Sequence, residues 1–176
     1  WRKALFQKIG VTSSADWNAA VRQLCKQHAW MDPQRLAIWG WSGGGAMTLN
    51  MLFRYPDLFA AGMSVAPVTD IALYDTIYQE RYCGDPRLVP EVYRQCSPIT
   101  FAGNLKGNLL LVHGTDDKTV MWSHTLGFVD RCIDAGVQLE YFVYPGQTHR
   151  LMGKDRVHFL KLLHDWLGRR LMPGPK

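Results

Sequence analysis

Two kinds of apolar pattern alternate along the chain. Apolar residues at three- and four-residue spacing predict helices at 14–28, 46–56, 123–135 and 154–171. Short, mostly apolar runs predict buried strands at 35–39, within 60–67, at 108–114 and at 138–146. Because strands and helices alternate, the sequence predicts an α/β fold with a mostly parallel sheet covered by helices.

One helix start and one long connection stand out in this pattern. Ser14 is a favourable N-cap for the first helix, whose apolar positions include Trp17, Val21 and Leu24. The connection 68–107 breaks the alternation, because it is long, rich in tyrosine and proline, and only partly helical in pattern. Long connections of this kind are often functional, so we expect functional residues within it.

The composition is that of a globular domain. The 176 residues are 47% hydrophobic and 20% charged, which suffices for one domain with a core. The net charge of +5 comes from scattered lysines and arginines, so no nucleic-acid partner is expected. No stretch resembles a signal peptide or a membrane span. The four cysteines have no metal-ligand spacing, and no metal or cofactor is expected. Cys83 and Cys96 could form a local disulfide, with buried free thiols as the open alternative.

A cluster of glycines follows the first predicted strand. The segment Gly40 to Gly45 reads "GWSGGG" and has Ser42 at its centre. Glycine in an ordered segment indicates a backbone path that side chains would obstruct. A flexible loop is one interpretation. The strand before and the helix after favour a sharp strand-to-helix turn that presents the serine hydroxyl.

Acidic residues and a histidine follow two later strands. Asp116 and Asp117 come after the strand 108–114, and His149 comes after the strand 138–146. The carboxyl ends of parallel strands meet at one edge of a sheet, so these groups are expected near Ser42. The chain order serine, aspartate, histidine is that of the α/β-hydrolase triad.

These residue types suit nucleophilic catalysis. His149 can take the proton of Ser42, and Asp117 can orient the imidazole, while Asp116 is expected to be a turn residue. The backbone N–H of Gly43, at a helix N-terminus, is expected to stabilise an oxyanion. His113 is expected to be structural and to hold the acid loop.

Four segments make the chain recognisable. The nucleophile, acid and histidine segments of the prolyl oligopeptidase family of serine peptidases resemble "DPQRLAIWGWSGGGAMTLNMLFRYPDLFAAGMSVAPV", "LLLVHGTDDKTV" and "YFVYPGQTH". The segment "LYDTIYQERYCG" resembles the dipeptidyl peptidase IV branch. The resemblance runs from about Ile9 onward. It implies the C-terminal half of an α/β-hydrolase fold.

The resemblance also implies a domain organisation. Residues 1–176 would form a single, partial hydrolase domain. The chain does not begin with Met, and we expect it to be a piece of a longer protein. The N-terminal β-propeller and the first hydrolase strands would lie outside it, together with a tyrosine that serves as second oxyanion donor in resembling proteins.

The resemblance assigns roles to further residues. Ser42, Asp117 and His149 match the family's triad. Tyr74 and Tyr78 match tyrosines that wall the pocket for a penultimate proline, although i, i+4 packing on a helix would also explain them. The remaining residues assigned to substrate binding are Val68, Val120, Trp41 and Thr119.

Three positions depart from the branch. Gly43 stands where the branch has tyrosine, and Thr119 stands where it has an asparagine that helps to hold a substrate carbonyl. Ile71 replaces an aromatic residue of the pocket wall. These departures bear on substrate preference and leave the triad intact.

The sequence therefore favours a serine peptidase that cleaves after a penultimate proline or alanine and releases N-terminal dipeptides through an acyl-enzyme. A broader serine hydrolase, such as an acylaminoacyl peptidase or esterase, is one alternative. A fragment that is inactive on its own is another, and a non-enzymatic hydrolase fold kept as a binding module is a third. We expect a peptide substrate as partner, a homodimer through the hydrolase domain of the longer protein, and a periplasmic or extracellular rather than cytoplasmic location.

Overall fold

Four strands form one parallel sheet. The computed structural model describes residues 2–172. The sheet order is β1 (Ala37–Trp41), β2 (Ala61–Val65), β3 (Asn108–Gly114) and β4 (Glu140–Tyr144), so spatial order follows chain order. All three pairings are parallel. The predicted α/β architecture is thereby confirmed, and β3 has the predicted bounds.

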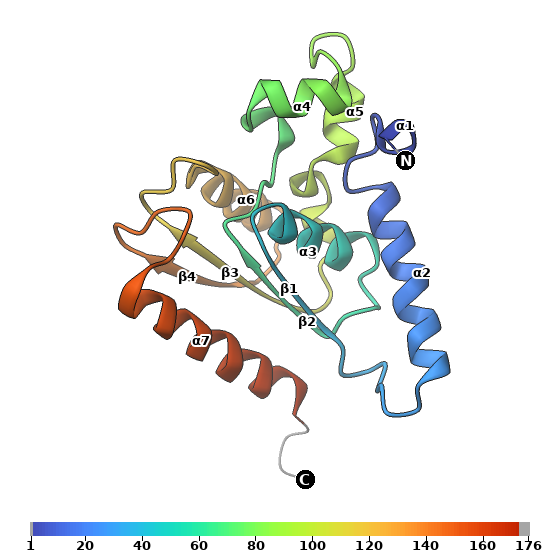
Figure 1. Cartoon of the computed structure of the whole chain (residues 1–176), viewed down its shortest axis with the longest axis vertical. Coiled ribbons are helices and arrows are strands. Elements are labelled where there is room, and N and C mark those ends of the chain that lie inside the picture. The colour runs from blue at the N-terminus through green and yellow to red at the C-terminus, as the bar shows by residue number, and fades with distance from the viewer. Residues whose placement is uncertain (1, 173–176) are drawn as a thin grey trace.

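Helices cover both faces of the sheet (Figure 1). α3 (Gly43–Arg54) and α6 (Ser123–Asp134) lie on one face, and α7 (Gly153–Leu171) lies on the other. Side chains alternate along a strand, so Leu109 and Leu111 of β3 pack toward α3 and α6, while Leu110 and Val112 pack toward α7. Each face of the central strands is therefore buried against a helix layer.

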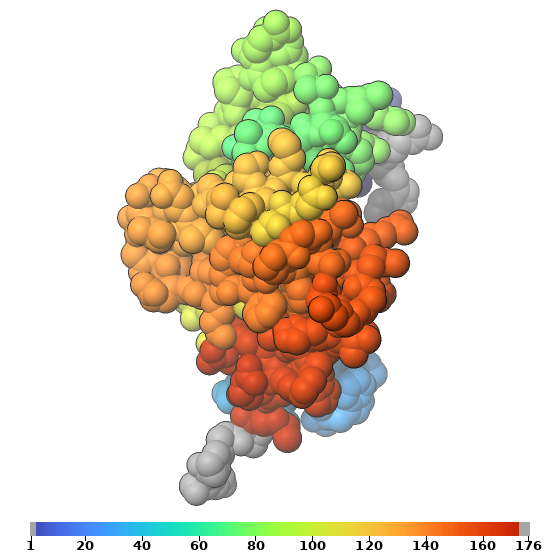
Figure 2. Space-filling view, turned by 90° about the vertical axis from the view of Figure 1, so that its left-hand side faces the viewer, coloured from blue at the N-terminus to red at the C-terminus, as the bar shows by residue number. Residues whose placement is uncertain are grey.

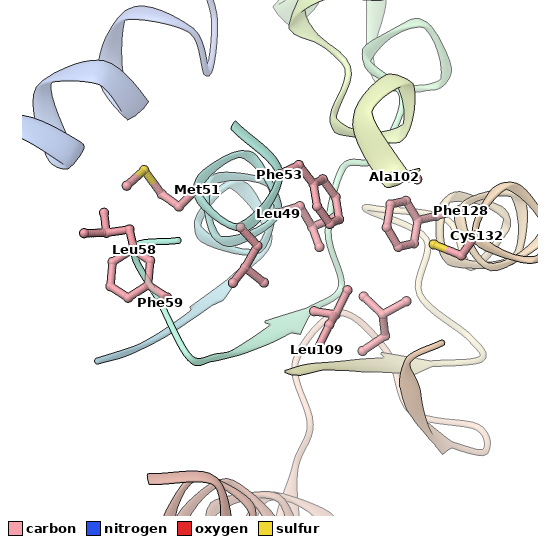
Figure 3. Packing of buried hydrophobic residues seen from close by; sticks show 11 residues of the cluster. Leu49, Met51, Phe53, Leu58, Phe59, Ala102, Leu109, Phe128 and Cys132 are labelled. Atoms are coloured by element: carbon pink, nitrogen blue, oxygen red, sulfur yellow. The ribbon is translucent and has the colours of Figure 1, made fainter. Parts of the chain in front are cut away.

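Aromatic side chains pack between α3 and α6. Figure 3 shows Phe53 of α3 facing Phe128 of α6, and their rings stack at 5.6 Å between centroids. Both rings are almost fully buried. Burial of a side chain of this size contributes about 1.5–3 kcal/mol, so the contact stabilises the packing of the C-terminal end of α3 against α6.

The connection between β2 and β3 forms a cap on the molecule, and its last part, around Ala102, packs in the core beside α3 and α6. It contains η1 (Ile71–Leu73), α4 (Thr76–Cys83), α5 (Pro90–Cys96) and η2 (Pro98–Asn104). Figures 1 and 2 show α4 and α5, in green, standing above the sheet and its helices. The N-terminal helices α1 (Arg2–Leu5) and α2 (Thr12–Gln27) flank this cap and α3.

The predicted start of the first helix is wrong. α2 begins at Thr12, and its N-cap is Val11. The Ser14 hydroxyl instead donates to the Val11 carbonyl at 2.9 Å, a bond that competes with capping. Val21 packs against the core, but Trp17 and Leu24 are exposed by 53% and 41%.

The first strand also differs from its prediction. β1 begins and ends two residues later than predicted, so Gly40 and Trp41 belong to the strand and not to the turn. It is an edge of the sheet in the described residues and only half-buried.

The free cysteines include Cys83 and Cys96, which are both buried. No helix within residues 2–172 combines the length and apolarity that a membrane crossing needs.

Candidate active site

Ser42 sits in a strained turn between β1 and α3. Its φ is 59° and its ψ is −119°, a conformation that residues with a Cβ rarely adopt. The turn is held from both sides, because Ser42 N donates to Val65 O at 2.8 Å and Ala46 N donates to Ser42 O at 3.0 Å. Such strain costs about 1–3 kcal/mol and persists only where the surrounding structure enforces it. The sharp turn matches the geometry expected for a presented serine.

Two of the neighbouring glycines are required by close backbone approach. A Cβ at Gly40 would lie 2.2 Å from Gly44 O, and a Cβ at Gly45 would lie 2.7 Å from Val65 O. A Cβ at Gly43 or Gly44 would meet no atom within 4 Å. The expected obstruction therefore applies at Gly40 and Gly45, where α3 passes over β1 and β2.

Gly43 opens α3 directly after the serine. The first amides of a helix have no intrahelical acceptor, and the helix dipole makes this end attractive to negative charge. The N–H of Gly43 is therefore suited to an oxyanion that forms beside Ser42. The bare Cα of Gly43 leaves open space at this position.

Asp117 is held rigidly in the loop after β3. Its Oδ1 accepts hydrogen bonds from the backbone N–H groups of Thr119 and Val120, both at 2.9 Å. Its Oδ2 lies 2.7 Å from His149 Nδ1. Asp117 is buried, whereas Asp116 is exposed and lies 3.6 Å from Lys118 Nζ. The structure thus brings Asp117, and not Asp116, to the histidine.

His113 supports the same carboxylate from below. Its Nε2 lies 2.9 Å from Val120 O and 3.2 Å from Asp117 Oδ2, and its Nδ1 lies 2.7 Å from Thr125 Oγ1. A carbonyl only accepts, so Nε2 carries the proton and Nδ1 accepts from the Thr125 hydroxyl. Burial lowers the pKa of His113, which keeps this ring neutral. Its contacts agree with the structural role expected from the sequence.

His149 lies on the loop after β4, next to the end of β1. The indole Nε1 of Trp41 donates to His149 O at 2.9 Å and ties this loop to the residue before Ser42. The contact of Nδ1 with Asp117 leaves Nε2 free to face a nucleophile. No hydrogen bond joins Ser42 Oγ to His149 within residues 2–172. Such bonds are often long before substrate binds.

Ser42 opens onto a pocket of about 290 Å³. This volume is near the lower end of the range for ligand pockets, about 300 Å³. Gly43 and the predicted residues Val68, Tyr74 and Tyr78 line the pocket with Ser42. The rings of Tyr74 and Tyr78 meet edge to face at 5.9 Å, so these residues pack on each other and also line the pocket. Burial raises the pKa of Tyr74, with a smaller contribution from Asp75.

Three residues assigned to substrate binding lie elsewhere in the described structure. Val120 is fully buried and holds Asp117 and His113 through its backbone. Thr119 lines a separate, more open hollow together with His149. Trp41 packs edge to face on Phe159 at 5.1 Å. Their visible contacts serve the acid and histidine loops.

The pocket also has walls that sequence reasoning missed. They come from the N-terminal segment, from α3, from α4, from the end of α5 and from the start of η2, and include Ile9, Gly10, Asn50, Gln79, Cys96 and Pro98. Asn50 interrupts an otherwise apolar run in α3, which was a usable signal. Ile9 and Gly10 reach the pocket only through tertiary packing, so no local pattern points to them.

Comparison with known proteins gives consistent matches over almost the whole chain. A family model described as "Prolyl oligopeptidase family" matches residues 1–173. Dipeptidyl peptidase 4 of Sus scrofa is 35% identical over 171 residues, covering 90% of this chain and 22% of the relative. Inactive dipeptidyl peptidase 10 of Mus musculus is 34% identical over 156 residues, covering 88% of this chain and 19% of the relative.

A solved structure has the same fold. The crystal structure of Porphyromonas gingivalis dipeptidyl peptidase 4 matches with a TM-score of 0.92 at 34% identity, covering 97% of this chain and 24% of the other. The chain thus spans about a fifth to a quarter of the length of these relatives.

Proposed function

The chain belongs to the prolyl oligopeptidase family, as its motifs predicted, and from this premise we propose that Ser42, His149 and Asp117 form the catalytic triad of a dipeptidyl peptidase. The observation that carries the proposal is the 2.7 Å contact between His149 Nδ1 and buried Asp117, at the sheet edge where Ser42 is presented. A relative named as inactive matches the chain well, so the fold alone does not decide activity. The presence of Ser42, His149 and Asp117 in this chain supports the proposed activity.

In the first step, Ser42 Oγ attacks the carbonyl carbon of the scissile peptide bond while His149 Nε2 takes the hydroxyl proton. The carbonyl oxygen becomes an oxyanion, to which Gly43 N–H donates. When the intermediate collapses, the C–N bond breaks and His149 returns the proton to the leaving amine.

In the second step, water attacks the acyl-enzyme. His149 takes a proton from the water and gives it back to Ser42 Oγ as the C–O bond breaks, which releases the dipeptide. Asp117 stays ionised throughout. It holds the imidazole so that Nδ1 is protonated and Nε2 faces the serine, and it stabilises the imidazolium that forms.

The pocket suits a small, flat side chain on the substrate residue before the scissile bond. A proline ring needs an apolar slot, and the walls beside Ser42 include Val68, Tyr74 and Tyr78. We therefore propose cleavage after a penultimate proline or alanine.

A broader serine hydrolase activity is the second candidate. It is favoured by the open space at Gly43 and by Ile71, a small aliphatic residue in the pocket wall. Such a site would hydrolyse short acyl esters better than proline anilides.

Hydrolysis of Gly-Pro-p-nitroanilide separates these candidates when it is measured beside two further substrates. One is the same compound with an acetylated amino terminus, and the other is a short acyl ester. The experiment uses the full-length protein. Cleavage of the free amine alone supports dipeptide release. Cleavage of both compounds, or of short esters only, supports the broader hydrolase and overturns the dipeptidyl peptidase proposal.

A further inference from the structure

A buried amide without a hydrogen-bond partner lies in the wall of the Ser42 pocket. Gln79 of α4 is 4% exposed and lines the pocket. Its carbonyl oxygen, Oε1, is buried and has no partner among the described residues. Leaving a buried polar group unpaired costs about 1–3 kcal/mol, so a protein rarely keeps one without a use for it.

The other buried amide of this pocket has a hydrogen-bond partner at both of its polar atoms. Asn50 Nδ2 donates to Ala46 O at 3.0 Å, and Asn50 Oδ1 accepts from Arg54 Nε at 2.8 Å. Gly10 packs against the same amide and would clash with it if it carried a Cβ, which would lie 2.6 Å from Nδ2. Asn50 is therefore locked as part of the wall, and Gln79 is left as the amide with an unused acceptor.

The surroundings of Gln79 make this acceptor effective. The pocket is otherwise lined largely by apolar groups, among them Ala46, Met47, Val68 and Ile71. A hydrogen bond formed in such a place competes with little water and is stronger than at the surface. The terminal torsion of a glutamine side chain is soft, so Oε1 can turn toward a ligand in the pocket.

We propose that Gln79 is a specificity-determining residue that accepts a hydrogen bond from a hydroxyl group on the substrate side chain held in the pocket. This inference rests on the proposed function, since it assumes that the residue before the scissile bond enters this pocket. The substrate class is a peptide whose penultimate residue is small and carries a hydroxyl donor. A hydroxylated proline fits, because its C4 hydroxyl projects from the ring away from the backbone.

The test compares Gly-4-hydroxyproline-p-nitroanilide with Gly-Pro-p-nitroanilide, using the ratio of their kcat/KM values in the full-length protein. Gln79→Leu and Gln79→Met both remove the amide carbonyl acceptor and replace it with an apolar side chain of similar length. We expect either variant to lower the ratio about fivefold to tenfold relative to the unmodified protein. Gln95→Leu, at an exposed glutamine of α5, is the matched control and should leave the ratio unchanged.

The outcomes separate the two proposals. A lowered ratio in both Gln79 variants, with Gly-Pro hydrolysis retained, supports the role of Gln79. An unchanged ratio while both anilides are cut overturns this inference and leaves the proposed function standing. Failure of the unmodified protein to cut either anilide overturns the proposed function, and this inference with it. Thermal melting of both variants identifies a folding defect, and the variant that folds then decides the test.

Discussion

At the scale of single residues, the site depends on how closely two backbones approach around Ser42. The serine adopts a positive φ because β1 must turn directly into α3, and α3 then crosses β2 with Gly45 against Val65 O. A side chain at Gly45 would push the helix away from the sheet, and with it the amide of Gly43. The same crossing leaves Gly44 in open space.

This difference predicts opposite results for two adjacent substitutions. Gly45→Ala should lower the free energy of unfolding by about 1–3 kcal/mol, because its Cβ would lie 2.7 Å from Val65 O. Gly44→Ala should leave stability unchanged or raise it by up to about 1 kcal/mol, since alanine is the better helix former. Urea denaturation of both variants measures this. Equal losses would contradict the assigned contact.

The two adjacent aspartates should differ sharply in their effect on catalysis. Asp117→Asn removes the carboxylate that orients His149, so kcat should fall about 10⁴-fold. Asp116→Asn changes an exposed side chain and should leave kcat close to that of the unmodified protein. Steady-state hydrolysis of Gly-Pro-p-nitroanilide compares them. A large loss for Asp116→Asn with a small one for Asp117→Asn would reverse the assignment.

At the scale of elements, β3 and α6 share two buried histidines. His113 is the penultimate residue of β3, and His124 is the second residue of α6, with its Nε2 unpaired among residues 2–172. Burial lowers the pKa of both below the ordinary 6.5. Both rings are therefore neutral in the folded protein at neutral pH, and protonation of either is penalised there.

The consequence for stability follows from linkage. Below pH 6.5 the unfolded chain takes up protons that the folded protein resists, so the free energy of unfolding should fall as the pH drops through this value. His124→Asn should weaken that pH dependence, because it removes one of the two buried rings that resist protonation. Melting temperatures at pH 7.5 and pH 5.5 measure it. An identical pH dependence in the unmodified protein and in His124→Asn would refute the explanation.

The elements were largely predictable from the sequence, and the pocket was predictable only in part. Short apolar runs located the four described strands and gave the bounds of β3, because apolar runs bounded by turns are local signals. The sequence did not predict the start of α2, because the Ser14 hydroxyl donates to a nearby carbonyl instead of capping the helix. It did not predict the bounds of β1, because the register of this strand is set by its long-range pairing with β2. The order of the strands predicted that Asp117 and His149 lie close together. The place of Gln79 in the pocket wall could not be predicted, because it depends on how α4 packs.

At the scale of the whole molecule, the sheet has an exposed edge. β1 ends the described sheet, and Trp39 on it is 48% exposed. An unpaired strand edge is a template for pairing with further strands or for aggregation. The family resemblance predicts additional hydrolase strands at this edge and a β-propeller that selects the substrate amine. These domains, and dimerisation through the hydrolase domain, stay predictions.

This organisation predicts a weak enzyme when residues 1–176 are expressed alone. The second oxyanion donor implied by the resemblance lies outside these residues, and loss of one such donor costs about 10²- to 10³-fold in kcat. Parallel assays of the fragment and the full-length protein on Gly-Pro-p-nitroanilide give the comparison. Equal rates would show that residues 1–176 hold the complete catalytic machinery.

The central claim is that Ser42 is the nucleophile. The measurement that tests it most directly is kcat for Gly-Pro-p-nitroanilide in the full-length protein with and without the substitution Ser42→Ala. We expect a loss of about 10⁴- to 10⁶-fold, because the alanine retains the turn and the pocket but has no hydroxyl to acylate. A loss of less than about tenfold would contradict it, since catalysis would then proceed without Ser42.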